Sequence, residues 1–385
     1  VCSSDLKDLL LNEIKKLRAG EFDEKMLQAN INNFKLYELQ SMESNEGRAD
    51  IFVNSFINGT NWKDEVTAID RMAKLTKEDI VAFADKYLKE DNYAVVYKKQ
   101  GKDPNEKKMT KPEITPIVSN RDVASPFLTS IQENAVRPIE PVFLDFKKDM
   151  SQLTAKSDIP VLYKQNTTND LFQLIYVFDM GNNNDKALGT AFDYLEYLGT
   201  SDMTPEELKS EFYRLACTFY VSPGNERTYV VLSGLNENMP AAMQLFEKLL
   251  ADAQVNKEAY NNLVGDILKA RADAKLNQGQ NFSRLMNYAM YGPKSPATNL
   301  LTEAELASMN PQKLVDRIHN QNNYKHRILY YGPSSSKDLL ATIEQYHQVP
   351  ATLKDIPAGN EYSYLETPAT KVLVAPYEAK QIYMA

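Results

Sequence analysis

The stretch from Ala187 to Leu235 constrains the fold most strongly, because it predicts a helix, a tight turn, a second helix and a strand in close succession. Gly199 suits a left-handed cap at the end of the first helix. Thr204 and Glu207 form the pattern of a capping box that starts the second helix. The segment 227–232 then alternates and is rich in β-branched residues, as strands are. The first helix has one apolar face, made of Leu188, Ala191, Phe192, Leu195 and Leu198.

A second strong feature is an internal repeat, in which two parts of the chain show the same pattern at a nearly constant offset. Gly59 and Gly292 each end a predicted helical segment, at an offset of 292 − 59 = 233. Ile80 and Leu314 share a place in a later helix, at 314 − 80 = 234. Identity is slight, but caps, apolar spacing and order agree, so we predict a duplicated unit. The matched segments are 23–45 with 256–276 (capped by Asp23 and Asn256), 77–87 with 311–321, and YAVVY at 93–97 with RILYY at 327–331.

The offset also predicts how the chain is divided. Residue 1 corresponds to about position 234, so the first copy has no counterpart of residues 159–233, and we expect the chain to be cut at both ends. A linker between the copies is expected at 98–158, because this stretch holds six of the 18 prolines. Edge or opening strands are predicted for PVFLDF at 141–146, KVLVAP at 371–376 and KQIYMA at 380–385. The predicted division is 1–97 for the end of the first repeat copy, 98–158 for the linker, 159–349 for the second repeat copy, 350–361 for a connector and 362–385 for the start of a further copy.

Composition excludes several classes of protein. A chain of 385 residues is long enough for two or three domains. The net charge is 44 − 52 = −8 with no basic cluster, which argues against nucleic acid or an anionic membrane surface as a partner. No apolar run approaches the length of a membrane span. Two cysteines, Cys2 and Cys217, support neither a disulfide framework nor a cysteine-based zinc site, and they leave the compartment open, an extracytoplasmic one included.

Histidine and cysteine offer no obvious catalytic site. The three histidines, His319, His326 and His347, include no pair with the spacing of metal ligands, so we interpret them as surface or capping residues. Cys217 has apolar neighbours and no nearby histidine, which predicts a buried structural thiol. Two serine-containing segments are predicted to be turns: Ser222-Pro-Gly-Asn225, and the GPSSS segment at 332–336, which lacks the lysine of a phosphate loop and makes Ser336 a helix N-cap.

Carboxylates on the two central helices are the remaining candidates. Asp193 and Glu196, three residues apart, share a helix face and could act as a general acid and base. A solvated helix face explains the same pair more simply. The same interpretation applies to the acidic residues of the second helix, Glu206, Glu207 and Glu211.

The pattern between Ala187 and Leu235 resembles the core of the pitrilysin/insulinase family of zinc metallopeptidases. In that family H-x-x-E-H lies on a helix that ends in a Gly-Thr turn; the two histidines bind zinc and the glutamate activates water. Counting back from Gly199-Thr200, the three positions fall on Thr190, Asp193 and Tyr194, which cannot do this chemistry. Asp266 lies roughly where the third zinc ligand would fall. The resemblance also rests on GEFDEKMLQANINN, LTKEDIVAFADKYL…YAVVY and LGTSDMTPEELKSEF.

The resemblance covers nearly the whole chain and implies an α+β fold: duplicated units of mainly antiparallel sheet with helices on one face. Two such halves close around an unfolded peptide, which adds as a strand to an exposed sheet edge. It implies no catalytic, cofactor-binding or metal-binding residue in this chain, because the zinc belongs to a unit that lies outside it. The implied partners are a peptide or unfolded protein substrate, and the other units of the same protein or a homologous subunit.

Two functions of different class follow. The chain is the non-catalytic, substrate-enclosing part of a zinc endopeptidase, or it belongs to a non-catalytic paralogue that binds peptides or acts as a scaffold for a separate active protease. An intact H-x-x-E-H upstream distinguishes them. The sequence leaves open the peptide substrate, the oligomeric state and any role of Asp193.

Overall fold

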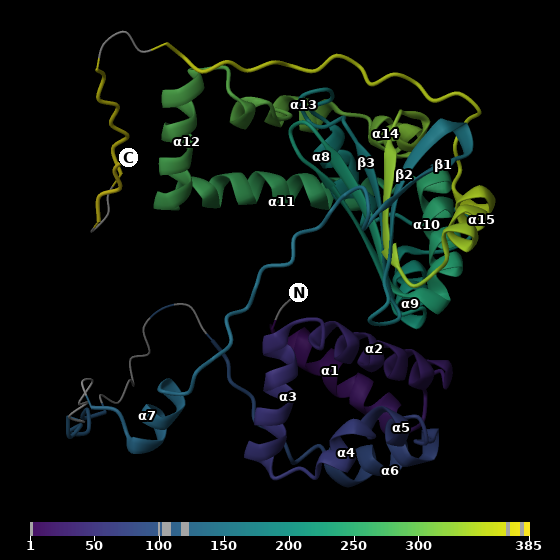
Figure 1. Ribbon diagram of the computed structural model, residues 1–385. Helices are drawn as coiled ribbons and strands as arrows, with labels where there is room; N and C mark the ends of the chain where they lie inside the picture. Colours follow the sequence, from purple (N-terminus) through teal and green to yellow (C-terminus); the bar gives the residue numbers. More distant parts are fainter. Residues whose placement is uncertain (1–2, 99–100, 102–108, 117–122, 367–369, 378–380) are drawn as a thin grey trace. The chain divides into compact units, whose positions relative to one another are not determined.

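A computed structural model describes every residue except 1–2, 99–100, 102–108, 117–122, 367–369 and 378–380 (Figure 1). The chain divides into two compact units, of which the first comprises 1–21 and 78–146 and the second 22–77 and 147–385. Each is described by itself below. Among the described residues, no helix has both the length and the apolar character that crossing a membrane requires.

The first unit contains α1 (Ser3–Arg18), nearly all of α6 (Lys77–Tyr87) and α7 (Pro126–Gln132). Gly20, at φ +71°, follows α1. Arg18 Nε donates to Asp85 Oδ1 at 2.9 Å and links α1 to α6. The apolar faces of both helices are nevertheless largely uncovered. The apolar side chains that are more than 45% exposed include Leu6, Leu9, Leu10, Phe83 and Tyr87.

Four helices open the second unit: α2 (Lys25–Ser41), α3 (Asn45–Asn58), α4 (Trp62–Val66) and α5 (Ala68–Met72). The single helix predicted over 23–45 is wrong, because α2 ends at Ser41. The Ser44 side chain accepts from Gly47 N and caps a new helix, which places Ser44 in extended rather than helical backbone. Gly59 ends α3 as predicted, and it does so in the left-handed conformation, at φ +64°.

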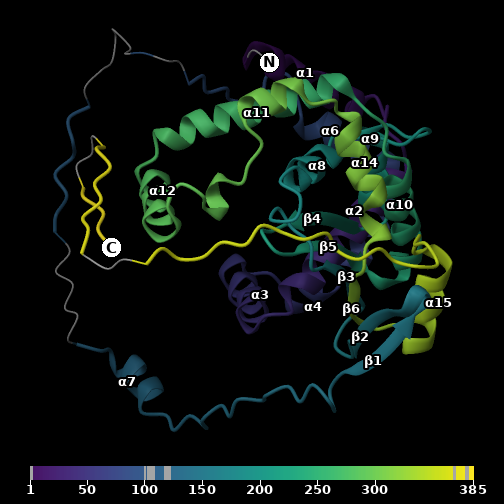
Figure 2. The same cartoon turned by 90° about the horizontal axis from the view of Figure 1, so that it is seen from above.

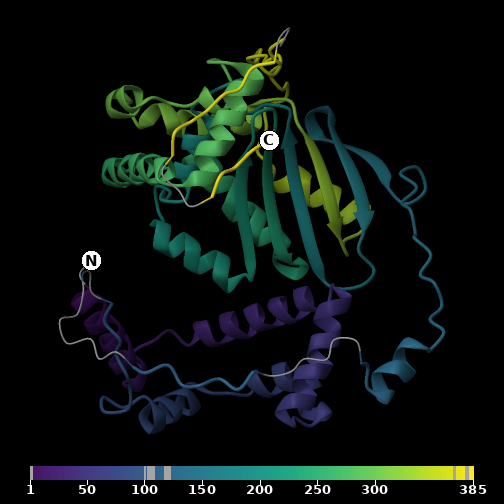
Figure 3. The same ribbon diagram turned by 90° about the vertical axis from the view of Figure 1, so that its left-hand side faces the viewer.

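The rest of the second unit is built on one six-stranded sheet in the order β1-β2-β6-β3-β5-β4 (Figure 3). Only β2 and β6 pair in parallel; the other four pairs are antiparallel, which confirms the predicted α+β class. The sheet edges are β1 and β4. The strands are β1 (Ser151–Ala155), β2 (Ile159–Gln165), β3 (Leu171–Phe178), β4 (Cys217–Pro223), β5 (Thr228–Leu235) and β6 (Arg327–Gly332).

Helices cover one face of this sheet and enclose the main core. Alternate residues of β3 reach the core, as the two-residue period of a strand requires: Leu174, Tyr176 and Phe178 are at most 2% exposed. They share that core with Phe246 of α10 and Leu314 of α14, both 0% exposed. The helices are α8 (Leu188–Leu195), α9 (Pro205–Arg214), α10 (Met239–Asp252), α11 (Lys257–Lys275), α12 (Gln278–Tyr291), α13 (Glu303–Ser308), α14 (Gln312–Asn320) and α15 (Ser336–Tyr346), with 3-10 turns η1 (Lys156–Asp158), η2 (Asn236–Asn238), η3 (Pro296–Thr298) and η4 (Gln321–Asn323).

Two helices extend beyond the sheet. Figure 2 shows α11 running away from the strands, with α12 joined at a sharp angle to its far end. The predicted Asn256 cap is confirmed, because its side chain accepts from Glu258 N and Ala259 N. Gly292, at φ +74°, follows α12 as the repeat predicts.

The central helix pair is confirmed with one correction. All five residues of the predicted apolar face of α8 are at most 3% exposed. The Thr204–Glu207 capping box forms at the start of α9. Gly199 does not have a positive φ. It is needed for close approach instead: a Cβ there would lie 2.3 Å from the carbonyl oxygen of Met203.

Several predicted strands do not form. The segments 93–97, 141–146 and 371–376 have no regular secondary structure, and neither do the described residues 381–385 of the last predicted strand. The strand at the β1 edge is Ser151–Ala155, later in the chain than PVFLDF. The other edge strand, β4, was not predicted, because CTFYVSP follows a helix directly and its polar residues hide the apolar alternation. A strand forms only where a neighbouring strand supplies hydrogen bonds.

Candidate functional site

The three α8 positions that the resemblance matched to a zinc motif have different environments. Thr190 is half-buried, Asp193 is exposed and Tyr194 is 0% exposed. Partial desolvation by the surrounding protein raises the pKa of the Asp193 carboxyl, and the neighbouring Glu196 carboxylate raises it further. Asp266, on α11, is exposed.

Tyr194 is a structural tie rather than a metal ligand. Its hydroxyl donates to Asn256 O at 2.5 Å and accepts from Asn256 N at 2.8 Å. Asn256 caps α11, so the tyrosine fastens the start of α11 to α8. The Tyr260 ring packs edge-on against it at 5.8 Å, and burial raises the pKa of the Tyr194 hydroxyl.

These residues do not fit a zinc ion. Zinc sites use histidine nitrogen, cysteine sulfur or carboxylate oxygen, and here one position is threonine and another is a tyrosine whose hydroxyl is fully engaged. In the part of the chain that the structure describes, no group of three or more His, Cys, Asp or Glu side chains could hold a metal. The helix keeps its place in the fold but lacks a ligand set.

The β4 edge beside α8 offers a different kind of site. Gly224 N donates to Arg227 O and Leu235 N donates to Ala216 O, so the even-numbered positions of β4 direct their backbone groups toward β5. In an antiparallel pair the orientation alternates from residue to residue. The backbone N–H and C=O groups of Cys217, Phe219 and Val221 therefore point away from β5, along the open edge.

A pocket of about 390 Å³ lies along this edge. Residues 217–221 of β4 form one wall, and Phe192 and Leu195 of α8 form another. Phe212 and Tyr213 of α9 and several residues of α2 complete the lining. The surroundings are thus mostly apolar, with open backbone groups on one side, which is the arrangement that binds an added peptide strand.

The histidines correct the sequence interpretation. His347 is 0% exposed and His326 is 7% exposed, so neither is a surface residue. His347 Nδ1 lies 2.6 Å from Glu247 Oε1, and the two imidazoles meet Nε2 to Nε2 at 2.9 Å. His326 Nδ1 lies 2.7 Å from Tyr324 O. The capping interpretation holds only for His319, half-buried with Nε2 3.0 Å from Ala253 O. Sequence spacing could not reveal a contact between residues 100 apart.

The contacts form one buried row, which runs from Glu247 through His347 and His326 to the Tyr324 carbonyl. Burial, reinforced by His347, lowers the pKa of His326 to about 4.

Glu247 is the centre of that network. Its carboxylate also accepts from the Tyr176 hydroxyl at 3.0 Å, the Asn322 amide at 2.9 Å and Gln348 N at 3.0 Å. Burial and the Glu247 charge raise the pKa of Tyr176 well above its ordinary value. Because these partners come from β3, η4 and the end of α15, the network joins the sheet to the helices that cover it.

The other predicted residues have structural roles. Cys217 is 5% exposed and burial raises the pKa of its thiol to about 12, which confirms an inert thiol. Glu206 is exposed, and Glu211 pairs with Arg214 at 2.7 Å on the surface of α9. The cap of α15 is Ser335 rather than Ser336, since its hydroxyl accepts from Asp338 N.

Comparison with known proteins places the fold. No family model matches the chain, and no curated protein matches it in sequence. Its fold is like that of the pitrilysin/insulinase peptidases. It matches the periplasmic protease PqqL from Escherichia coli with a TM-score of 0.51 and 14% identity, over 93% of this chain and 42% of that one. The chain therefore spans less than half the length of that protease.

Two further solved structures are similar at lower scores. A peptidase M16 inactive domain from Pseudomonas fluorescens gives a TM-score of 0.47 at 16% identity, over 56% of this chain and 54% of that one. A mutant of the ferredoxin protease FusC, solved in complex with Arabidopsis ferredoxin, gives 0.49 at 10% identity, over 91% and 42%.

Proposed function

We propose that this chain is the non-catalytic part of a zinc endopeptidase that cleaves peptides or unfolded proteins, and that it lines the substrate-enclosing chamber. The observation that carries the proposal is the open edge of β4. Three residues there have backbone groups that point away from β5, along a pocket with apolar walls, and within the described residues no group of metal ligands lies on α8 beside it. The zinc would be bound by a catalytic unit elsewhere in the parent protein.

The edge sets the mode of recognition. Main-chain hydrogen bonds bind any extended peptide in the same way, because every residue except proline has the same backbone groups. The apolar walls then favour peptides with hydrophobic side chains at alternate positions. Most segments of a folded protein already pair their backbone groups internally, so we expect peptides and unfolded segments to be the main substrates.

A proline substitution on the edge tests the proposal. Val221→Pro removes an N–H that points away from β5, so the sheet keeps its hydrogen bonds, as edge prolines normally allow. We expect the variant to fold and to bind a fluorescein-labelled extended hydrophobic peptide at least about tenfold more weakly. Binding would be measured by fluorescence anisotropy, and folding by circular dichroism.

Two control variants complete the test. Val221→Ala removes most of the side chain but keeps the N–H, and it should bind the peptide almost as wild type does. Tyr220→Pro removes an N–H on the β5 side and should lower the melting temperature instead. If Val221→Pro binds the peptide as tightly as Val221→Ala does, the β4 edge is not the binding site.

The second candidate, a non-catalytic paralogue acting as a peptide-binding or scaffold subunit, is favoured by the way Tyr194 occupies a former ligand position. Both functions lead us to expect that the purified chain neither binds stoichiometric zinc nor cleaves peptides. The coding sequence upstream separates them: an intact H-x-x-E-H supports the endopeptidase, and a degenerate motif supports the scaffold.

A further inference from the structure

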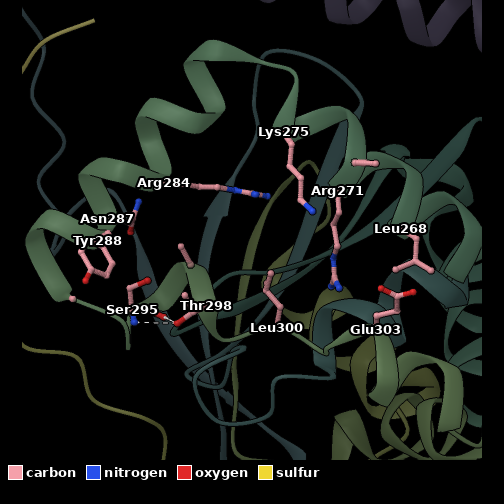
Figure 4. A pocket seen from close by; sticks show the side chains of 13 residues that line it. Leu268, Arg271, Lys275, Arg284, Asn287, Tyr288, Ser295, Thr298, Leu300 and Glu303 are labelled. Carbon is pink, nitrogen blue, oxygen red and sulfur yellow. Dashed lines mark hydrogen bonds between the residues drawn. The ribbon is translucent and has the colours of Figure 1, made fainter. Parts of the chain in front are cut away.

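A second pocket, remote in sequence from the β4 edge, lies where α11, α12 and the segment 295–303 meet. Its volume is about 670 Å³. Figure 4 shows three basic side chains directed into it, Arg271 and Lys275 from α11 and Arg284 from α12. The two on α11 are four residues apart and therefore share one helix face.

The charge in this pocket is unbalanced. Three basic side chains and one acidic side chain, Glu303, give the lining a net charge of 3 − 1 = +2, whereas the whole chain carries −8. Within the described residues, neither of the arginines nor Lys275 forms an ion pair, although acidic residues outnumber basic ones in this protein. Like charges that share a cavity repel one another, and a bound anion relieves that repulsion.

Neutral hydroxyl and amide groups in the lining are mostly engaged. Thr298 Oγ1 donates to Ser295 O at 2.8 Å, and Asn287 Nδ2 donates to Ser283 O at 3.0 Å. The donors left for a ligand are thus the guanidinium and ammonium groups, with the Tyr288 hydroxyl beside them. Arginine binds carboxylate through two parallel hydrogen bonds, which gives such a site geometric preference as well as charge.

The rest of the lining indicates the kind of anion. Leu268, Ala272, Ala297 and Leu300 contribute apolar surface between the charged groups. The α12 residues that line the pocket lie beyond the first turn of that helix, so the backbone N–H groups that usually hold phosphate are not directed there. Apolar surface among cationic groups suits the methylenes and carboxylates of acidic side chains better than a compact phosphate.

We propose that this pocket binds acidic segments of a peptide, with the carboxylates of glutamate or aspartate held by Arg271, Lys275 and Arg284. The proposal rests on the proposed peptide-binding function and adds a substrate preference to it. Peptides with an acidic run bind more tightly than isosteric neutral ones, and the gain decreases with ionic strength because Lys275 and Arg284 are exposed to solvent and Arg271 is only half-buried.

The test compares two labelled peptides that differ only by glutamate or glutamine at the same positions. The double variant Arg271→Gln/Arg284→Gln should lose at least about tenfold in affinity for the glutamate peptide and nothing for the glutamine peptide. The matched control is Lys257→Gln/Lys269→Gln, which removes the same charge from exposed positions of α11 outside the pocket. It should leave both affinities within about twofold, because solvent and salt screen exposed charges. Circular dichroism checks that both variants fold.

Each other result has a definite meaning. Equal losses in the two double variants would show general charge attraction and overturn the proposal. An affinity for the glutamate peptide that does not depend on Arg271 and Arg284 would also overturn it, while glutamine-peptide binding that Val221→Pro abolishes would leave the β4 site intact. If the wild-type protein binds neither peptide, the proposed peptide-binding function is wrong. The last outcome is that inorganic tripolyphosphate displaces a labelled reporter from the pocket while the protein does not prefer the glutamate peptide. The pocket would then be a phosphate site, and the proposal would be overturned.

Discussion

The segments 93–97 and 327–331 end the two parts of the chain that the sequence predicts to be equivalent, yet only the second is a strand. RILYY forms β6, which lies between β2 and β3 and places Ile328 at 0% and Tyr330 at 2% exposure. YAVVY has no regular structure, and Val96 is 94% exposed. The two sequences have similar strand propensity. The difference shows that the neighbouring strands, rather than the segment itself, decide whether a strand forms.

The helices that the sequence matched in the two predicted copies show the same contrast more weakly. Leu314 of α14 is 0% exposed, because α14 packs against α8 and α10. Ile80, at the matched position of α6, is only half-buried, and Phe83 on the same helix is 59% exposed. Helical hydrogen bonds are local, so α6 forms regardless, but its apolar face stays partly uncovered, and the described residues 3–97 contain no strand.

The largest expected effect is on the buried network around Glu247. Glu247→Ala removes the partner of four polar groups, three of them buried, and should lower the free energy of unfolding by about 3–5 kcal/mol. Urea denaturation measures this. The exposed Glu258→Ala is the control and should change it by less than about 0.5 kcal/mol. A loss under 1 kcal/mol for Glu247→Ala would mean that the network is not a main stabiliser.

A matched pair of substitutions tests whether 93–97 and 327–331 differ in packing. Ile328→Ala leaves a cavity in the core and should cost about 2–4 kcal/mol. Val96→Ala removes exposed methyl groups and should cost less than about 0.5 kcal/mol. Equal losses would show that 93–97 is packed in solution. Amide hydrogen exchange gives an independent readout, with protection expected for 328–331 and little for 93–97.

Acid should destabilise the folded state through the buried His326. His326 has its pKa lowered from 6.5 to about 4, so the unfolded chain binds more protons than the folded one between those values. Stability is therefore complete above about pH 6.5 and falls as the pH is lowered toward 4, by about 3 kcal/mol in total from this group. Denaturation curves at several pH values measure the slope. His326→Gln should remove this contribution, whereas His319→Gln should retain it.

The smallest expected effect is at Tyr194, which joins α8 to α11. Tyr194→Phe leaves both backbone groups of Asn256 without their hydroxyl partner and should cost about 1–3 kcal/mol. Tyr197→Phe, at a tyrosine that is 43% exposed, is the matched control and should be nearly neutral. Thermal denaturation compares them. Equal melting temperatures would show that the tie between α8 and α11 is dispensable.

The sequence alone determined what depends on local chemistry. The Thr204–Glu207 capping box, the apolar face of α8, the α11 cap at Asn256 and the glycines at 59 and 292 follow from groups a few residues apart, and each was predicted. The family resemblance likewise located Thr190, Asp193 and Tyr194 on one helix. A local pattern is enough for such features because their hydrogen bonds close within one or two turns.

Only the tertiary structure decided the features that join distant residues. It placed β4 at an open edge, left YAVVY without a partner strand among the described residues and brought Glu247, His347 and His326 into one buried row. It also gathered Arg271, Lys275 and Arg284 around one pocket. Strand pairing, burial and charge clustering depend on which segments meet in space, and no spacing along the chain encodes a contact between residues 100 apart.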